Sequence, residues 1–440
     1  MRQSSATGGR ATRRRTTFSL AAALTGTAML ATACGGGSET DGRVTLRFSW
    51  WGSEERAQIT NKAVDAFEKA NPDITVETES IDFESYFDRL STSVAAGDEP
   101  DVITMGGAYP REYAERGVLL DLAEVSEQLD LGALDEKALS NGEFDGSAYG
   151  VPTGVNTFAV VANPAVFEEA GVELPDDDAW GWEDYAEIAG EVSEGTPGDV
   201  YGSEDPTQPD TLDLYANQRT GLGLYAPGGG VAVERGTVND WFELTTALEE
   251  AGATPSASMT AELAAQAAPE QTLMGRGKAG MKLAWSNQLA AFREASGDDL
   301  VLLRAPGETT SAEGTGMWLQ ASQLYTISKR SEHPEEAAAL VDFLVNDPRA
   351  ADFIKSDRGI PANPEIREHL EGDLSESQKV EFAFVDRMSG LVDGDFVIGP
   401  TGSTESVDLL QRTHEAVLFG RQSPSQGAKQ FVTELSDAVS

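Results

Sequence analysis

Strand and helix patterns alternate at short intervals near the N-terminus, and this alternation constrains the fold more than any other feature of the chain. Residues 44–50 alternate apolar and polar side chains, which is typical of a strand. A helical pattern over 54–70, a strand at 74–77, a helix over 86–96 and an apolar strand at 101–105 follow. Such closely spaced units predict an α/β fold in which helices cover an open parallel sheet. Ligands of such sheets bind outside the carboxyl ends of the strands, here residues 50–53, 80–83 and 106–109.

The rest of the chain continues with a larger share of helix. A strand is expected at 157–162, followed by further strands at 278–285, 300–303 and 326–328. Further helices are expected over residues 164–170, 182–194, 238–251, 259–268, 335–346, 407–419 and 425–439, with another beginning at 347–348.

Length and charge limit the class of protein. The chain has 440 residues and a formal net charge of −42, which becomes −47 without the five arginines of residues 1–33. This acidity argues against nucleic acid, anionic lipids and phosphate ligands as partners. A single cysteine excludes an internal disulfide. Without residues 1–33 the chain keeps about 400 residues, more than one hydrophobic core usually holds, so two lobes are expected. Three histidines without ligand-like spacing predict no metal, and nothing in the sequence calls for a cofactor.

The first 34 residues have the organisation of an export signal. A basic head contains Arg13, Arg14 and Arg15, the apolar run 18–30 is too short to span a membrane, and Cys34 follows small residues. This arrangement resembles a bacterial lipoprotein signal. We therefore expect residues 1–33 to be removed, lipid on Cys34 to hold the protein on the outer face of the cell membrane, and 34–42 to form a flexible tether. A soluble secreted protein with an incidental thiol is the alternative.

Four of the seven tryptophans follow predicted strands or a Gly-rich segment. They are Trp50, Trp51, Trp285 and Trp318. Flat aromatic faces beside carboxylates and amides suit the apolar face and polar rim of a sugar ring. Core packing is the alternative for each ring, and we interpret Trp180, Trp182 and Trp241 as packing residues.

Motifs of known enzymes do not appear in the sequence. There is no Gly-x-Ser-x-Gly elbow, no His-Glu-x-x-His and no phosphate loop. Pairs of carboxylates, which a glycoside hydrolase needs, arise by chance among 74 acidic residues. A membrane-anchored glycoside hydrolase therefore stays an alternative, as does a receptor for a non-sugar ligand such as a peptide or a polyol phosphate.

Seven segments in order resemble the sugar-binding lipoproteins of bacterial ABC importers, the broad family that includes maltose-binding protein. They are FSWWG (48–52), AFEKANPDITV (66–76), AAGDEPDV (95–102), YGVP (149–152), NPAVFEEAGVELP (163–175), GRGKAGMKLAW (275–285) and HPEEAAALVDFL (333–344). The resemblance implies a two-lobed periplasmic-binding-protein-like fold with a central ligand cleft and a hinge. It also implies a solute receptor that binds a mono- or oligosaccharide, delivers it to the importer's permease subunits and performs no chemistry.

The same resemblance implies boundaries and contacts. It places hinge crossings near residues 151–156, 314–319 and 365–395, an N-terminal lobe of 43–153 and 320–370, and a C-terminal lobe of 154–319 and 371–440. Where maltose-type members carry an Asp and an Arg after the third strand, this chain has Gly106-Gly107-Ala108-Tyr109. The implied ligand contacts are Trp50, Trp51, Glu54, Asp82, Tyr86, Gly107, Tyr109, Asn156, Trp285, Ser286, Asn287, Trp318 and Arg358.

Overall fold

The computed structural model describes residues 43–106, 109–264, 268–307, 314–393 and 397–439, which belong to one unit that begins at Arg43. The expected signal, the tether and Cys34 lie outside these residues. No helix in the described ranges is long and apolar enough to cross a membrane.

The N-terminal strands and helices confirm the predicted alternation. β1 (Val44–Trp51) lies between β2 (Ile74–Ile81) and β3 (Val102–Met105) and is parallel to both. The connections are α1 (Glu54–Ala70) and α2 (Phe83–Ala96). The Ser53 and Asp82 side chains accept hydrogen bonds from backbone N–H groups in the first turns of α1 and α2. These caps place both helix starts directly behind the carboxyl ends of β1 and β2.

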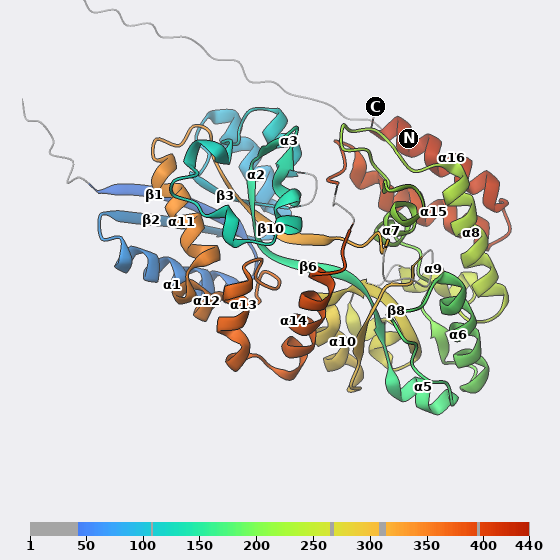
Figure 1. The fold of residues 1–440 in the computed structure, drawn as a ribbon. Coiled ribbons are helices and arrows are strands. Elements are labelled where there is room, and N and C mark those ends of the chain that lie inside the picture. Colours follow the sequence, from blue (N-terminus) through green and yellow to red (C-terminus); the bar gives the residue numbers. More distant parts are fainter. Residues whose placement is uncertain (1–42, 107–108, 265–267, 308–313, 394–396, 440) are drawn as a thin grey trace, which may run out of the picture. The chain divides into compact units, whose positions relative to one another are not determined.

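A long strand joins two parts of the sheet. β6 (Gly150–Ala162) pairs antiparallel with β10 (Leu319–Ile327) through Gly150–Thr157. From Phe158 onward it pairs antiparallel with β8 (Ala279–Trp285) and β9 (Val301–Arg304), and β7 (Tyr201–Ser203) is parallel to β8. The path from β2 to β7 can be followed in Figure 1, with β6 running from β10 to β8.

The sheet is therefore mixed, and the expectation of a parallel sheet holds for the first three strands and for the pair β7 and β8 but not for β6, β9 and β10. Helical crossovers connect those strands and keep them parallel. β6 and β10 are reached through longer segments that reverse the chain direction, so they pair antiparallel. The fold class is nevertheless confirmed as mixed α/β.

Helices cover the sheet throughout. Beside the strands of the first part lie α3 (Tyr109–Glu115), α4 (Glu136–Leu139), α11 (Pro334–Asn346), α12 (Pro348–Ile354) and α13 (Pro364–Leu370), with the small hairpin β4 (Glu143–Phe144) and β5 (Ser147–Ala148). The second part carries α5 (Pro164–Ala170), α6 (Trp182–Gly195), α7 (Pro209–Thr220), α8 (Arg235–Glu250), α9 (Ala257–Ala264), α10 (Leu289–Ser296), α14 (Glu376–Ser389), α15 (Ser406–Leu418) and α16 (Pro424–Ala438). The sequence patterns missed α3, α4, α7, α10, α13 and α14. The predicted end of α9 at residue 268 cannot be compared, because residues 265–267 lie outside the described ranges.

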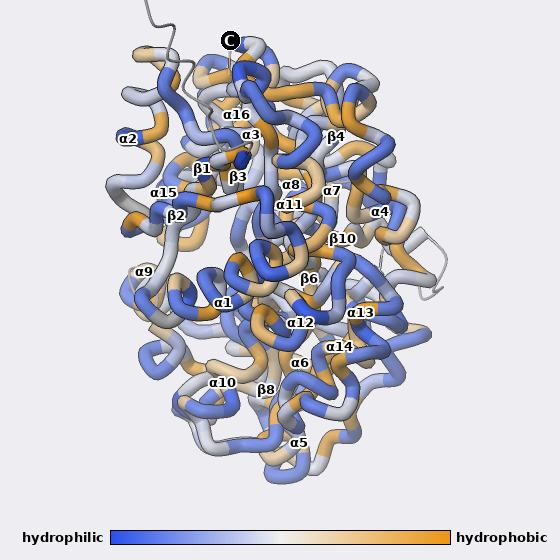
Figure 2. Tube along the Cα trace, turned by 90° about the vertical axis from the view of Figure 1, so that its left-hand side faces the viewer, coloured by the Kyte–Doolittle hydropathy of each residue, from blue (hydrophilic) through white to orange (hydrophobic). Residues whose placement is uncertain are grey.

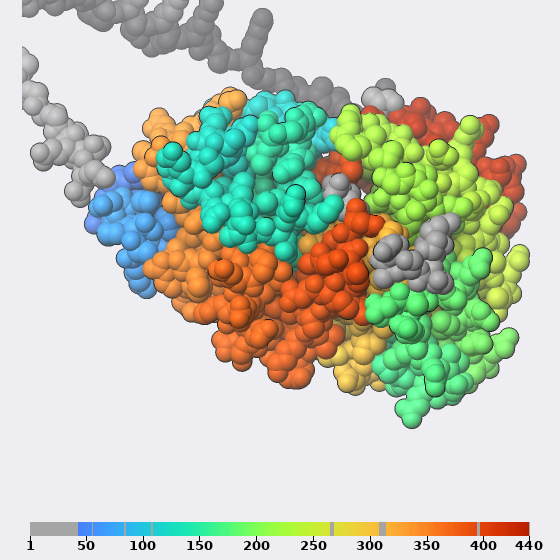
Figure 3. All heavy atoms as spheres, viewed as in Figure 1, coloured from blue at the N-terminus to red at the C-terminus, as the bar shows by residue number. Residues whose placement is uncertain are grey.

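Segments far apart in the sequence lie together on one face. Figure 3 shows the teal segment around residues 110–150 beside the orange segment around 335–390. Arg367 Nη1 lies 2.9 Å from an Asp135 carboxylate oxygen, and the Asp135 N–H donates to the Ala362 carbonyl at 3.0 Å. These contacts fix the loop before α13 to the loop before α4.

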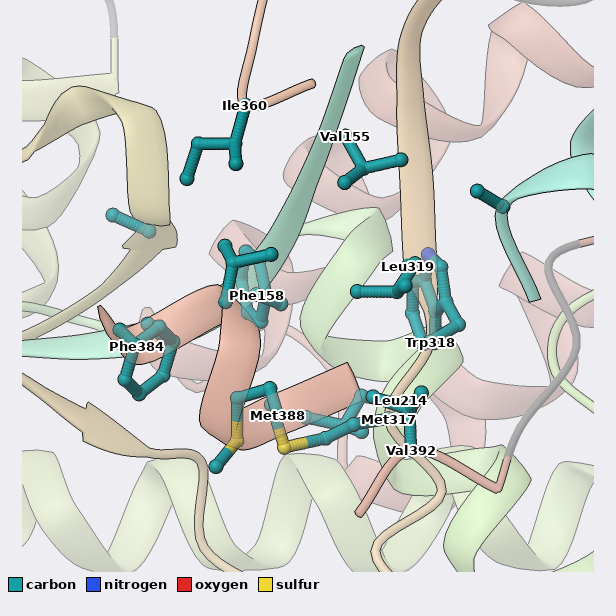
Figure 4. Packing of buried hydrophobic residues seen from close by; sticks show 14 of the residues in the cluster. Val155, Phe158, Leu214, Met317, Trp318, Leu319, Ile360, Phe384, Met388 and Val392 are labelled. Carbon is teal, nitrogen blue, oxygen red and sulfur yellow. The ribbon is translucent and has the colours of Figure 1, made fainter. Parts of the chain in front are cut away.

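The core continues from one part of the sheet to the other. Figure 4 shows Val155 and Phe158 of β6 with Trp318, Leu319 and Met388 in one buried cluster. Along the surface helices hydrophilic and hydrophobic residues are interspersed in Figure 2, as expected of amphipathic helices.

The three tryptophans interpreted as packing residues are buried. The rings of Trp182 and Trp241 meet edge to face at 5.2 Å, and Trp180 donates its indole N–H to the Arg304 carbonyl at 3.0 Å. Both contacts lie in the interior of the second part, so these rings stabilise the fold.

Candidate functional site

The two tryptophans at the end of β1 have different environments. Trp50 is fully buried, and its ring lies 4.8 Å from that of Phe48. Trp51 points to the opposite face of the sheet, where its half-buried ring lies 5.4 Å from Phe87. The assignment of Trp50 as a ligand contact is therefore wrong in this structure, because Trp50 offers no accessible surface.

Tyr86 is also a core residue. Its side chain is 1% exposed, its hydroxyl donates to the Thr104 carbonyl at 2.9 Å, and burial raises the pKa of the phenol. It packs behind Trp51 at 5.3 Å and supports that ring. Its assignment as a ligand contact is corrected, because the first turn of α2 directs this side chain inward.

An aromatic strip lies at the carboxyl ends of β1 and β3. The rings of Phe87 and Tyr109 stack at 3.6 Å and 6°, and Phe87 also contacts Trp51. We call Trp51, Phe87 and Tyr109 the aromatic strip. Tyr109 is 38% exposed, so the strip has an open end.

The polar residues expected beside the strip are accessible. Glu54 and Asp82 are exposed at the starts of α1 and α2. Asp82 caps α2 by accepting the N–H of Ser85 at 3.0 Å. Gly107 lies outside the described residues.

Asn156 occupies the middle of β6, next to the change of strand partners. Its side-chain N–H donates to Ser322 Oγ on β10 at 2.7 Å, while its amide oxygen has no hydrogen-bond partner among the described residues. The residue is 6% exposed. The amide oxygen therefore keeps its capacity to accept a hydrogen bond from a hydroxyl group.

Trp285, at the end of β8, is the best-placed of the predicted tryptophans. Its ring is half-buried and lies 5.2 Å from Phe158 and 6.4 Å from Trp318, both edge to face. Its side chain donates a hydrogen bond to Asp210 in the first turn of α7. We call Phe158, Trp285, Trp318 and Asp210 the Trp285 cluster.

The neighbours of Trp285 divide into buried and exposed residues. Ser286 is buried, and its hydroxyl oxygen accepts the Thr157 N–H at 3.2 Å. Trp318 is 2% exposed and supports Trp285 from behind. Direct ligand contacts from Ser286 and Trp318 are therefore not supported, because both side chains are enclosed. Asn287 is exposed beside Trp285.

Arg358 lies in the interior between α1 and the loop before Ile360. Its side chain is fully buried, donates to Thr60 Oγ1 at 2.7 Å and lies 3.5 Å from Asp357 Oδ2. Arg56 donates to the same carboxylate at 2.8 Å. Arg358 therefore holds the loop against α1 and has no open surface for a ligand, which corrects its assignment as a contact.

Two carboxyl groups of α7, those of Asp210 and Asp213, have raised pKa values. Burial raises the pKa of Asp210 to about 6, although the hydrogen bond from Trp285 lowers it. Burial also raises the pKa of Asp213 to about 7, and the nearby Asp210 adds to this rise. Asp210 thus supplies a hydrogen-bond acceptor at the edge of an aromatic face, an arrangement suited to a sugar hydroxyl.

The predicted residues fall into two groups. Trp51 and Tyr109 belong to the aromatic strip, while Trp285 and Asn287 end β8, and Asn156 lies on the strand shared by both parts of the sheet. Asp210, Phe87 and Ser322 were missed. Among the described residues no group of three or more His, Cys, Asp or Glu side chains could hold a metal ion.

Comparison with known proteins identifies the family. The family described as bacterial extracellular solute-binding protein matches residues 62–380, which is most of the chain. The chain belongs to this family, and the fold agrees with that of its solved members.

Individual relatives are distant but cover most of the chain. An extracellular solute-binding protein family 1 structure from Alicyclobacillus acidocaldarius has a TM-score of 0.78 at 29% identity, covering 90% of this chain and 98% of that one. A lipoprotein of Streptomyces antibioticus is 26% identical over 76% of this chain and 73% of its own length. The diacetylchitobiose binding protein DasA of Streptomyces coelicolor is 23% identical over 79% of both chains.

Proposed function

We propose that this protein is the carbohydrate receptor of an ABC importer and binds a mono- or oligosaccharide between the aromatic strip and the Trp285 cluster. The observation that carries the proposal is the half-buried Trp285 ring, which is fixed by Phe158 and by its hydrogen bond to Asp210. A rigid aromatic face beside a carboxylate suits a pyranose, which has an apolar face and a hydroxyl rim. The diacetylchitobiose binding relative supports a sugar ligand.

The proposed contacts are accessible residues of the two groups and their neighbours, together with the buried Asn156, whose amide oxygen has no hydrogen-bond partner among the described residues. They are Trp51, Glu54, Asp82, Tyr109, Asn156, Asp210, Trp285 and Asn287. Rings provide stacking surface, and the amide and carboxylate oxygens accept hydroxyl hydrogen bonds.

The proposed mechanism is closure of two lobes around the sugar. We assign 43–153 and 320–370 to one lobe and 154–319 and 371–440 to the other. The change of β6 partners between Thr157 and Phe158 lies close to the first proposed boundary. A ligand that contacts both lobes stabilises the closed state by its additional contacts, and periplasmic binding proteins are known for this kind of hinge closure. The permease subunits would recognise the closed form.

We propose further that lipid on Cys34 holds the receptor at the outer face of the cell membrane. The lipoprotein relative from Streptomyces antibioticus supports this arrangement.

Isothermal titration of the purified protein against a panel of mono- and oligosaccharides tests the ligand class. We expect at least one sugar to bind with a dissociation constant well below 1 mM. Its binding free energy would then be more favourable than about −4 kcal/mol, the value that corresponds to 1 mM. Binding of peptides or polyol phosphates, with no sugar bound, would contradict the proposal.

A second measurement separates a receptor from an anchored glycoside hydrolase. The bound oligosaccharide is incubated with the protein and analysed chromatographically. We expect it to be recovered intact, whereas cleavage products that disappear in an Asp210→Asn variant would assign the chain to the hydrolase alternative.

A further inference from the structure

A cavity lies at the carboxyl ends of the parallel strands β7 and β8, next to the Trp285 cluster. Its volume is about 290 Å³, and side chains of α9 and α15 line part of its wall. The segment from Glu204 to Asp210 follows β7, lines the cavity at Asp205 and reaches the Trp285 side chain through Asp210. This short segment therefore connects the wall of the cavity to the Trp285 cluster.

Asp205 lines this cavity, and one of its carboxylate oxygens is buried in the wall without a hydrogen-bond partner among the described residues. Its side chain is 9% exposed, and Oδ1 accepts the Thr207 N–H at 2.8 Å. Oδ2 has no hydrogen-bond partner among the described residues. His414 Nε2 is the neighbouring polar atom, but it lies 3.8 Å away, too far for a hydrogen bond.

The other charged groups of the cavity do not neutralise Asp205. Lys282 is paired with Glu204, which also accepts the Met274 N–H at 2.7 Å. Glu415 adds a further carboxylate to the lining.

His414 is held by hydroxyl groups rather than by a charge. Its Nε2 lies 3.0 Å from Thr245 Oγ1 and 3.2 Å from Thr207 Oγ1. Burial lowers the pKa of the imidazole, so it is neutral at neutral pH. The charges of Lys282 and Glu204 neutralise each other in their ion pair. The cavity lining therefore keeps the negative charges of Asp205 and Glu415.

An enclosed carboxylate oxygen is costly unless a donor reaches it, and a cation satisfies it better than a hydroxyl. The lining also contains Leu263, Leu283 and Leu410, which suit the apolar face of a ring. We propose that this cavity binds the protonated amine of an amino sugar, with Asp205 Oδ2 as its acceptor. This inference rests on the proposed carbohydrate-binding function and specifies its substrate class.

Three disaccharides of one linkage test the inference by titration calorimetry on the purified protein. Chitobiose carries a C2 amine, diacetylchitobiose a neutral acetamide and cellobiose a hydroxyl. We expect chitobiose to bind tightest, by about tenfold or more, because a hydrogen bond to a charged group is stronger than one between neutral groups. Asp205→Asn removes the charge at nearly constant size and should abolish this preference.

Asp408→Asn is the matched control. Asp408 is exposed on α15, the helix that carries His414, so its replacement changes the net charge equally without entering the cavity. It should keep the preference for the amine. A neutral disaccharide that binds as well as chitobiose, or a preference that survives Asp205→Asn, would overturn the inference while leaving the carbohydrate receptor intact. Binding of no sugar in the whole panel would instead overturn the proposed function itself.

Discussion

Trp285 carries most of the proposed recognition at the level of single residues. Trp285→Ala removes the accessible ring while leaving Phe158 and Trp318 in place, so we expect a loss of ~2 kcal/mol, roughly thirtyfold in affinity for the bound sugar. Calorimetry with that sugar measures the loss. Trp285→Phe is the control, because it keeps an aromatic face but not the donor to Asp210, and it should recover part of the affinity. An unchanged affinity in Trp285→Ala would assign the ring to core packing.

Neighbouring residues of a strand show what the sequence alone could and could not predict. Trp50 and Trp51 end the same strand and are equivalent in the sequence pattern. Their side chains point to opposite faces, so one enters the core and the other joins the aromatic strip. Which face is buried depends on helices packed from distant parts of the chain, and the sequence pattern did not contain this information.

Asp210 could not be selected from the sequence for a different reason. It is one of 74 acidic residues, and nothing in its local sequence marks it. Its role comes from α7, which brings it to the end of β8.

At the level of elements, α7 places two carboxylates in an enclosed environment, and this has a consequence for stability. The pKa of Asp213 is about 7 in the folded protein, above its value of 3.8 when exposed, so the protonated form is favoured by folding. Protonated Asp213 therefore contributes its full share to the free energy of unfolding below about pH 4. This contribution is lost as the pH rises through about 7, because the buried carboxyl group then ionises.

Asp213→Asn replaces the carboxyl group by an amide that does not ionise, so the variant should not lose stability at this position as the pH rises. Asn can still accept the Leu224 N–H with its amide oxygen, as Asp213 Oδ1 does. We expect the variant to melt roughly 1–3 °C above the wild type at about pH 8, with a smaller difference at about pH 5. Thermal unfolding across this range measures the difference. A difference in melting temperature between variant and wild type that stays constant with pH, or that becomes larger at lower pH, would contradict the raised pKa of Asp213.

The elements were predicted unevenly, and the reasons are physical. β1, α1 and α5 follow clear periodic patterns with capping residues, and the sequence located them well. α7 was missed because its apolar residues, among them Leu212, Leu214 and Tyr215, do not lie on one helical face. It is covered on several sides, so tertiary packing rather than amphipathic pattern stabilises it.

At the level of the whole molecule, the proposed anchor predicts where the protein resides. Cys34→Ala should release the protein from the membrane fraction or block its processing, because the lipid would have no attachment site. Fractionation and the mass of the mature protein report this. Ser38→Ala, four residues further on, should leave both unchanged. A Cys34→Ala protein that is processed normally and stays with the membrane would contradict the lipoprotein assignment.

The central claim is that one sugar holds two lobes together. Binding alone raises the melting temperature of any receptor, so thermal shift does not test this claim. Small-angle X-ray scattering of the purified protein with and without the saturating sugar tests it most directly. The account predicts a smaller radius of gyration in the bound sample, because only the closed state makes both sets of contacts. Equal radii in the two samples, with binding verified by calorimetry, would contradict hinge closure and indicate a rigid, preformed site.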